Sequence, residues 1–117
     1  QLVIIYSLLR LGNEMLKVGI CGYGTVGQSF VGHIMAHKDI IKSNLSDDFE
    51  ISIIADRSID RKEHPSNIKV TSDPMNLVND PNIDIIIELL GGIDLPYKII
   101  IESIKNNKHI IYTFQKH

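Results

Sequence analysis

The sequence predicts an α/β protein with a doubly wound parallel sheet of about five strands, because two patterns alternate along the chain. Short apolar runs, which are typical of buried strands, are separated by stretches of helical spacing. The strongest run, Ile83 to Leu90, is apolar on both faces in its middle, as in the centre of a parallel sheet. Right-handed crossovers between such strands put helices on both faces and give the strand order 3-2-1-4-5.

The first glycine turn follows the apolar strand Val18 to Cys21, and its glycines fall as G-x-G-x-x-G. Gly22 permits a tight turn, and Gly24 lets a pyrophosphate approach the backbone. Gly27 lets the next helix pack close to the strand. The N-terminus of that helix offers free N–H groups and a partial positive charge to phosphates. The pattern therefore predicts a Rossmann-like dinucleotide site.

Beyond this turn, apolar residues at helical spacing predict a helix from about Thr25 to His37 or slightly beyond. A turn-rich loop is expected from Ser43 to Asp48. The second strand, Phe49 to Ala55, ends in Asp56 and Arg57.

At this strand end an acid normally bonds the ribose 2′-OH of NAD, whereas a nearby arginine accommodates the 2′-phosphate of NADP. Asp56 lies farther beyond the glycines than the usual spacing of about 20 residues, so the longer helix and its loop must take up the difference. Since Asp56 and Arg57 are both present, these residues leave the cofactor open. A solvated turn pair is the alternative.

The middle of the chain has weaker signals. Residues 58–67 are polar and predict a loop or a short helix, and Lys69 to Thr71 predicts a brief third strand. Asp73 is expected to cap a short helix that begins with Pro74 and ends near Asn79.

A second glycine turn, Gly91-Gly92, stops the fourth strand at its carboxyl end, the edge where open α/β sheets bind ligands. A plain strand-to-helix turn is the alternative. Asp94 is expected to cap the next helix. The predicted core stripe of this helix comprises Tyr97, Ile100, Ile101 and Ile104.

The same helix is expected to end at Asn106-Asn107, because asparagine tolerates the left-handed conformation. His109 to Tyr112 then begins a fifth strand.

Composition fits one ordinary soluble domain, since 44% of the 117 residues are hydrophobic and 22% are charged. A net charge of -2 gives no basic footprint, so nucleic acid is not an expected partner. The single cysteine, Cys21, lies in the first strand and is expected to be a buried apolar residue. Its lack of a partner fits a reducing compartment, and we expect a cytoplasmic protein.

Residues 1–14 are rich in aliphatic side chains, but the run is shorter than the about 20 residues that span a bilayer. It lacks the basic region and cleavage site of a secretory signal. We expect residues 1–14 to be an extra or disordered segment, and no membrane partner. His33 and His37 form an i, i+4 pair, but no acid or cysteine is placed to complete a site, so no metal is expected.

Four blocks resemble the amino-terminal half of homoserine dehydrogenase: Val18–Gly27, Ala55–Arg57, Asp80–Gly92 and Ile104–His109. The first glycine turn is shared with many dehydrogenases. The third block, D-P-x-I-D-x-x-x-E-L-x-G-G, is far more specific. The resemblance covers about Leu16 to Ile111.

That family reduces aspartate 4-semialdehyde to homoserine with NADPH or NADH, in the route to threonine and methionine. By resemblance, the first glycine turn would cradle the pyrophosphate, and Arg57 would meet the 2′-phosphate, which favours NADP with NAD possible. The second turn would lie toward the nicotinamide. The expected cofactor-binding residues are Gly22, Tyr23, Gly24, Thr25, Val26, Gly27, Asp56, Arg57, Leu90, Gly91 and Gly92.

The resemblance fails after Tyr112, where the family continues into a T-A-N-K-A-L segment whose lysine reaches the active site. Here the residues are Thr113-Phe114-Gln115-Lys116-His117, and no role is carried onto Lys116. The family's substrate-binding and dimerisation region has no counterpart. We therefore expect residues 15–117 to be a truncated Rossmann domain with no catalytic residue of its own. Full-length members are expected to be homo-oligomers.

Two alternatives compete with a homoserine dehydrogenase fragment. One is a free-standing module that senses NAD(P) and passes on a signal. The other is the nucleotide-binding half of a different dehydrogenase.

Overall fold

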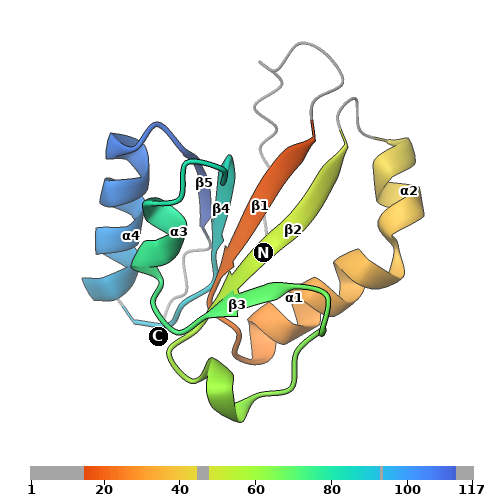
Figure 1. The fold of residues 1–117 in the computed structure, drawn as a ribbon, viewed down its shortest axis with the longest axis horizontal. Coiled ribbons are helices and arrows are strands. Elements are labelled where there is room, and N and C mark those ends of the chain that lie inside the picture. Colours follow the sequence, from red (N-terminus) through yellow and green to blue (C-terminus); the bar gives the residue numbers. More distant parts are fainter. Residues whose placement is uncertain (1–14, 45–47, 93, 113–117) are drawn as a thin grey trace.

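The computed structural model describes residues 15–44, 48–92 and 94–112, and these form one parallel sheet with helices on both sides (Figure 1). The sheet has five strands in the order β3-β2-β1-β4-β5, so the predicted order and strand direction are confirmed. The predictions for residues 1–14 and 113–117 lie outside the described residues. The strands are β1 (Leu16–Cys21), β2 (Phe49–Ala55), β3 (Lys69–Thr71), β4 (Ile85–Glu88) and β5 (His109–Tyr112).

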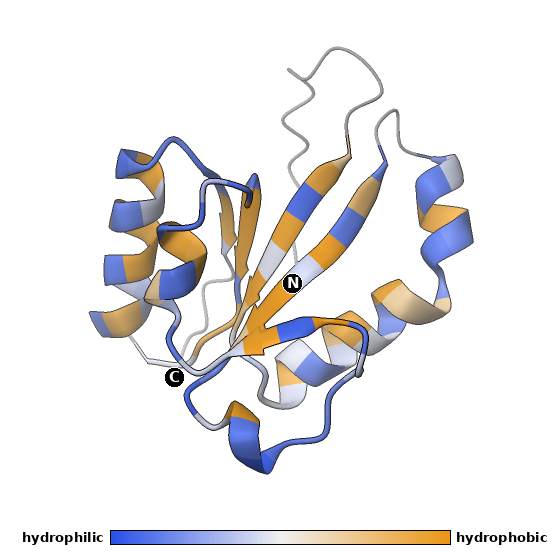
Figure 2. Ribbon diagram, viewed as in Figure 1, coloured by the Kyte–Doolittle hydropathy of each residue, from blue (hydrophilic) through white to orange (hydrophobic). Residues whose placement is uncertain are grey.

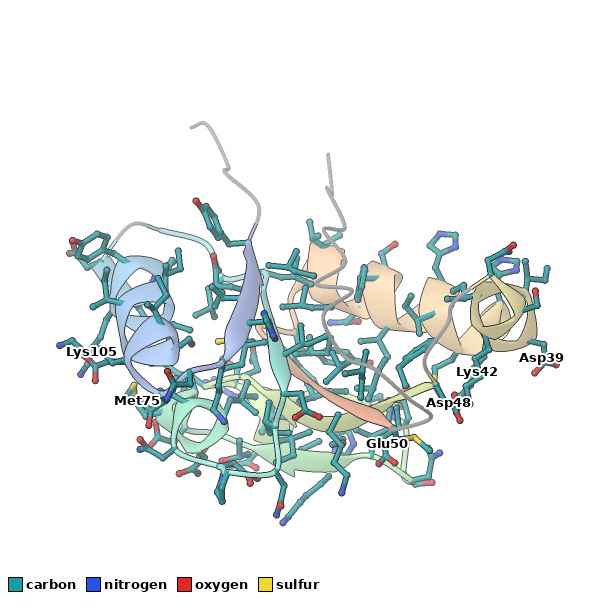
Figure 3. The ribbon with its side chains drawn as sticks, turned by 90° about the horizontal axis from the view of Figure 1, so that it is seen from above. Asp39, Lys42, Asp48, Glu50, Met75 and Lys105 are labelled. Carbon is teal, nitrogen blue, oxygen red and sulfur yellow. The ribbon has the colours of Figure 1, made fainter. Side chains whose placement is uncertain are left out.

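The helices divide between the two faces of the sheet, with α1 and α2 on one side and α3 and α4 on the other (Figure 3). This is the doubly wound arrangement that the sequence predicts. The helices are α1 (Thr25–Ala36), α2 (Lys38–Ser43), the 3₁₀ turn η1 (Ile59–Arg61), α3 (Met75–Val78) and α4 (Asp94–Lys105).

Each face of the sheet has its own apolar core, because successive side chains of a strand point to opposite sides. Ile20 and Ile54 are fully buried in the core on the α1 side. Cys21 and Ile86 belong to the core on the side of α3 and α4. Figure 2 shows hydrophobic residues along much of the strands and hydrophilic residues in most of the loops. Both faces of β4 are therefore largely buried, as its run of isoleucines predicts.

The first helix ends earlier than a single continuous helix would. α1 stops at Ala36, and the backbone at His37 leaves the helical region (φ -118°, ψ 23°) before α2 begins at Lys38. A 2.8 Å ion pair joins Lys42 of α2 to Asp48, directly before β2 (Figure 3). This turned second segment, which the sequence pattern did not separate from the first, closes the connection from α1 back to the sheet.

The short helix α3 begins one residue later than predicted, with Met75 as its first helical residue and Pro74 at the position before it. The Asp73 carboxylate still accepts a hydrogen bond of 3.0 Å from the Met75 N–H, and the missing N–H of Pro74 is harmless at this helix start. The helix then places Leu77 and Val78, both fully buried, against the sheet.

The predicted core face of α4 is wrong. Tyr97 and Ile104 are 66% and 57% exposed, and the buried side chains are Pro96, Ile99 and Ser103. Ser103 can be buried because its hydroxyl donates to the Ile99 carbonyl at 2.6 Å, so no polar atom is left unpaired. The face with Pro96, Ile99 and Ser103 therefore packs on the sheet, while the predicted stripe is half-buried at Ile100 and Ile101 and exposed at Tyr97 and Ile104.

The ends of α4 follow the predictions in part. Asn107 has φ 59°, and the N–H groups of Lys108 and Asn107 donate to the carbonyls of Ser103 and Ile104. These two bonds form a Schellman motif, the usual left-handed end of a helix. Asp94 is the first helical residue of α4 rather than the residue before it, so its carboxylate lies in the positive first turn.

Candidate dinucleotide site

The two glycine turns meet at the carboxyl edge of the sheet, the lower edge in Figure 1, where β1 passes into α1. The N–H of Gly22 donates to the Ala55 carbonyl at 2.8 Å, and the N–H of Leu89 donates to the Cys21 carbonyl at 2.7 Å. These bonds extend both ladders of β1 past the strand itself. The edge lies between β1 and β4, where the strand order reverses, which is the topological switch point at which such sheets bind ligands.

Gly22 and Gly27 allow close backbone packing in the first turn. Gly22 has φ +109°, and a Cβ there would lie 2.9 Å from the Leu89 carbonyl carbon. A Cβ on Gly27 would lie only 2.2 Å from the Gly22 carbonyl oxygen. Both positions therefore require glycine for the fold itself, in agreement with the roles that the motif predicts.

Gly24 is different, because a Cβ there would meet nothing within 4 Å. It precedes α1 and is exposed, and no side chain caps the helix. The first turn of α1 contains no acidic residue, and Thr25 and Val26 are both exposed. Open space beside an uncapped, positive helix end is what a pyrophosphate needs. The residues present therefore fit a dinucleotide at this turn.

Asp56 holds the first turn from the end of β2. The Tyr23 N–H donates to Asp56 Oδ1 at 2.9 Å, and the Ser58 N–H donates to Asp56 Oδ2 at 2.9 Å. Lys62 completes the cluster: its Nζ lies 2.8 Å from Asp56 Oδ2 and 3.0 Å from the Tyr23 carbonyl oxygen. We call Tyr23, Asp56 and Lys62 the turn clamp. Its lysine has no motif to mark it in the sequence.

The charge of the Asp56 carboxylate is stabilised within this cluster. Burial opposes ionisation, but the hydrogen bonds from Lys62 and from the N–H groups of Tyr23 and Ser58 outweigh it, so the pKa of Asp56 is lowered. Gln28 adds a further bond to the same turn, since its Nε2 donates to the Tyr23 carbonyl at 3.1 Å. Both peptide groups of Tyr23 are thus fixed from outside the motif.

Arg57 is exposed at the end of β2, next to Asp56. In the described part of the chain it makes no hydrogen bond or ion pair, so its guanidinium is available to a ligand. The structure thus brings Asp56 and Arg57 to the same edge as the first glycine turn.

The second glycine turn starts beside a buried acid. Glu88 is 2% exposed, and its Oε2 accepts the Leu90 N–H at 2.5 Å. Burial raises the pKa of Glu88, although the bond from Leu90 opposes this shift. Gly91 and Gly92 are exposed, and a Cβ on either would meet nothing within 4 Å. Leu90, Gly91 and Gly92 therefore line the same edge. Glu88 belongs to the third resembling block but was not among the predicted site residues.

The remaining candidates have simpler explanations. Cys21 is fully buried, and burial together with the nearby acids Glu88 and Asp56 raises its pKa to about 12, so it is an inert core residue. The rings of His33 and His37 are exposed and stacked, with centroids 6.0 Å apart. Within residues 15–44, 48–92 and 94–112, no three potential ligands gather as a metal site would require. In the same ranges no helix is long and apolar enough to cross a bilayer.

The chain is similar to known proteins over most of its length. A family model described as the NAD-binding domain of homoserine dehydrogenase matches residues 22–114. Homoserine dehydrogenase of Pseudomonas aeruginosa is 31% identical over 96 residues, which is 82% of this chain and 22% of that protein. The enzyme of Methylobacillus glycogenes is 32% identical over 98 residues, which is 82% of this chain and 24% of the relative.

Solved structures agree. A homoserine dehydrogenase of S. aureus at pH 7.0 superposes with a TM-score of 0.78 at 30% identity, over 91% of this chain and 28% of that one. The enzyme of Thiobacillus denitrificans gives a TM-score of 0.77 at 29% identity, over 85% and 23% of the two chains. The chain thus spans about a quarter of the length of the relatives that it matches.

Proposed function

The chain belongs to the family of homoserine dehydrogenase NAD-binding domains, and from this membership we propose that it forms the cofactor half of an enzyme that interconverts aspartate 4-semialdehyde and homoserine. The observation that carries the proposal is the family match over residues 22–114, which includes both glycine turns. The relatives favour this function over a free-standing sensing module. We place the enzyme in the cytoplasm, in the route to threonine and methionine, and as a homo-oligomer.

Each end of the cofactor has its own residues in this proposal. The backbone of residues 22–27 and the open end of α1 hold the pyrophosphate. Asp56 can accept one further bond at Oδ1 from the ribose, because its other oxygen already accepts two. Leu90, Gly91 and Gly92 lie along the cofactor toward the nicotinamide, with Glu88 fixing the first peptide of their turn.

Arg57 supports NADP as the preferred cofactor. Its guanidinium can pair bidentately with a 2′-phosphate, whereas an ionised Asp56 on its own would repel that group. NAD remains a possible second ligand, since its ribose needs only hydrogen-bond acceptors. A dinucleotide supplies or accepts a hydride in this family's reaction, and the described residues bind and orient it.

Hydride transfer also requires residues that bind the substrate and donate a proton. Hydride transfer needs a substrate held against the nicotinamide and a group positioned to protonate the developing alkoxide. This chain matches only about a quarter of the relatives' length. We therefore expect the 117 residues alone to bind cofactor without oxidising homoserine. Homoserine-dependent NADPH formation by the purified chain, followed at 340 nm, would contradict that expectation.

Calorimetric titration with NADP and NAD tests the site directly. Gly24→Ala adds a methyl group where only a ligand would meet it, so binding of both cofactors should weaken by about tenfold or more. Gly32→Ala is the matched control, because a Cβ there also meets nothing within 4 Å but lies on α1 away from the turn. Unchanged affinity in Gly24→Ala would remove the pyrophosphate from this turn.

The same titration tests the choice of cofactor. Arg57→Ala should weaken NADP by about 1.5–3 kcal/mol, the scale of a hydrogen bond to a charged group, and leave NAD nearly unchanged. Equal losses for both cofactors would exclude Arg57 from 2′-phosphate recognition.

A further inference from the structure

Lys62 belongs to the candidate site by geometry, although no motif includes it. Its Nζ lies 3.0 Å from the Tyr23 carbonyl oxygen and 2.8 Å from Asp56 Oδ2. The side chain is 26% exposed, so the ammonium is only partly withdrawn from solvent. An ammonium has three N–H donors, and the third has no partner within the described part of the chain.

The turn clamp limits how many hydrogen bonds the Asp56 carboxylate can accept from a ribose. A carboxylate that selects NAD must present oxygens to the ribose hydroxyls. Here Oδ2 already accepts from Ser58 and Lys62, and Oδ1 accepts from the Tyr23 N–H. The acid therefore holds the first glycine turn with only Oδ1 left to accept one further bond, and its negative charge is balanced by the ammonium beside it.

The position of the Lys62 ammonium matters for the choice of dinucleotide. The ammonium lies between the first glycine turn and the end of β2, the two places where a dinucleotide bound at this edge puts its pyrophosphate and adenosine ribose. Arg57 lies in the same connection between β2 and β3 as Lys62, and it is exposed. Two cations thus lie beside the end of β2, and Asp56 is already paired with one of them.

We propose that Lys62 is a specificity-determining residue that selects a 2′-phosphorylated dinucleotide, by engaging Asp56 and by offering its remaining N–H to the 2′-phosphate. The inference rests on the proposed cofactor function. It goes beyond Arg57 because it explains how an acid at the end of β2 is compatible with NADP. Removing the ammonium should free Asp56 Oδ2 for a ribose hydroxyl and so shift the preference toward NAD.

The test measures dissociation constants of NADP and NAD by calorimetry for the full chain and for three variants. Lys62→Met removes the charge while keeping an unbranched stem, and it should lower the ratio of NADP to NAD affinity by about tenfold or more. Lys62→Arg restores a cation and should keep the ratio within about threefold of the wild type. Arg61→Met is the matched control, since it removes an exposed positive charge from the adjacent position.

Adenosine 2′,5′-bisphosphate and 5′-AMP test the adenosine end alone. Lys62→Met should weaken only the bisphosphate, because the two ligands differ only in the 2′-phosphate. Thermal unfolding of each variant checks that the fold is retained.

The outcomes separate this inference from the proposed function. If the wild type binds neither dinucleotide, the proposed function fails. If it binds them but Lys62→Met weakens both cofactors equally, Lys62 only braces the turn and the specificity role is overturned. An unchanged ratio in Lys62→Met, or a loss as large in Arg61→Met, would also overturn it.

Discussion

Tyr23 shows how one residue can tie a ligand-binding turn to the rest of the molecule. Its ring is buried in the core on the α1 side, while its N–H donates to Asp56. Its carbonyl accepts hydrogen bonds from both Gln28 and Lys62. The residue between the first two glycines of the motif is thus held at its side chain and at both peptide groups. The backbone of the turn is thus fixed without a ligand, and for the proposed pyrophosphate such preorganisation would lower the entropy cost of binding.

Glu88 makes a prediction that depends on pH. Because its pKa is raised in the fold, its contribution to stability is fully present below the ordinary value of 4.5 and is lost as the pH rises through the higher folded value. Glu88→Gln keeps an oxygen for the Leu90 N–H but carries no charge. We expect it to be more stable than the wild type near pH 7.5, on the order of 1 kcal/mol, and equal to it near pH 4.

Urea denaturation at several pH values measures this difference. Glu63→Gln, at an exposed position, is the control for removing a carboxylate from the surface. A difference between Glu88→Gln and the wild type that stays constant from pH 4 to pH 8 would show that the charge of Glu88 does not cause it.

At the scale of the elements, the junction of β1 and α1 brings two backbone segments into close contact. Gly27→Ala would place a methyl group 2.2 Å from the Gly22 carbonyl oxygen, a backbone atom that is itself fixed by the turn. We expect a loss of about 3 kcal/mol or more in the free energy of unfolding. Gly32→Ala, on the same helix but in open space, should instead gain about 0.5–1 kcal/mol.

Urea midpoints with unchanged m-values report both effects as stability changes. If Gly27→Ala were as stable as the wild type, helix α1 would have to sit farther from β1 than it does here. Comparing Gly27→Ala with Gly24→Ala also separates folding from binding. Gly27→Ala should lose stability, whereas Gly24→Ala should lose affinity for the dinucleotide without losing stability.

Many of the turns and helix ends could be predicted from the sequence, because each depends on residues close together in the chain. The glycine turn, the Asp73 cap and the left-handed Asn107 depend on a few neighbouring residues. The break between α1 and α2 could not be found in this way. Its cause lies in the backbone at His37 and in the ion pair of Lys42 with Asp48, neither of which leaves a periodic trace.

At the scale of the whole molecule, sequence prediction failed where contacts are distant. Lys62 and Tyr23 are 39 positions apart, so nothing local connects them. The face of α4 was misjudged because apolar content was taken as the guide to burial. Packing against β4 and β5 selected the face with Ile99 and Ser103 instead.

Exposed apolar side chains of α4 and β5 predict how the purified chain behaves. Tyr97, Ile104 and Tyr112 are 66%, 57% and 54% exposed, and neighbouring isoleucines of α4 and β5 are only half-buried. Apolar surface of this kind favours association. We expect the chain to self-associate at about 100 μM and the double variant Tyr97→Lys/Ile104→Lys to stay monomeric in sedimentation velocity.

Ile40 provides the control, since it is 64% exposed on α2, on the other side of the sheet. Ile40→Lys adds one positive charge, half of what the double variant adds, at an exposed isoleucine outside the α4 surface, and it should leave association unchanged. If it prevents association as well as the double variant does, net charge rather than the α4 surface is the cause.

The strand order also determines how long β1 waits for its neighbour β4 during synthesis on the ribosome. β1 is central, yet the Lys17 N–H and its acceptor Asp84, at the approach to β4, are 67 positions apart. At a translation rate of about 5–20 residues per second, roughly 3–13 seconds separate the appearance of these two segments. During that interval β1 can pair with β2 alone, and its other edge is open to any strand nearby. The nascent chain is therefore most in need of a chaperone just before its fourth strand leaves the exit tunnel.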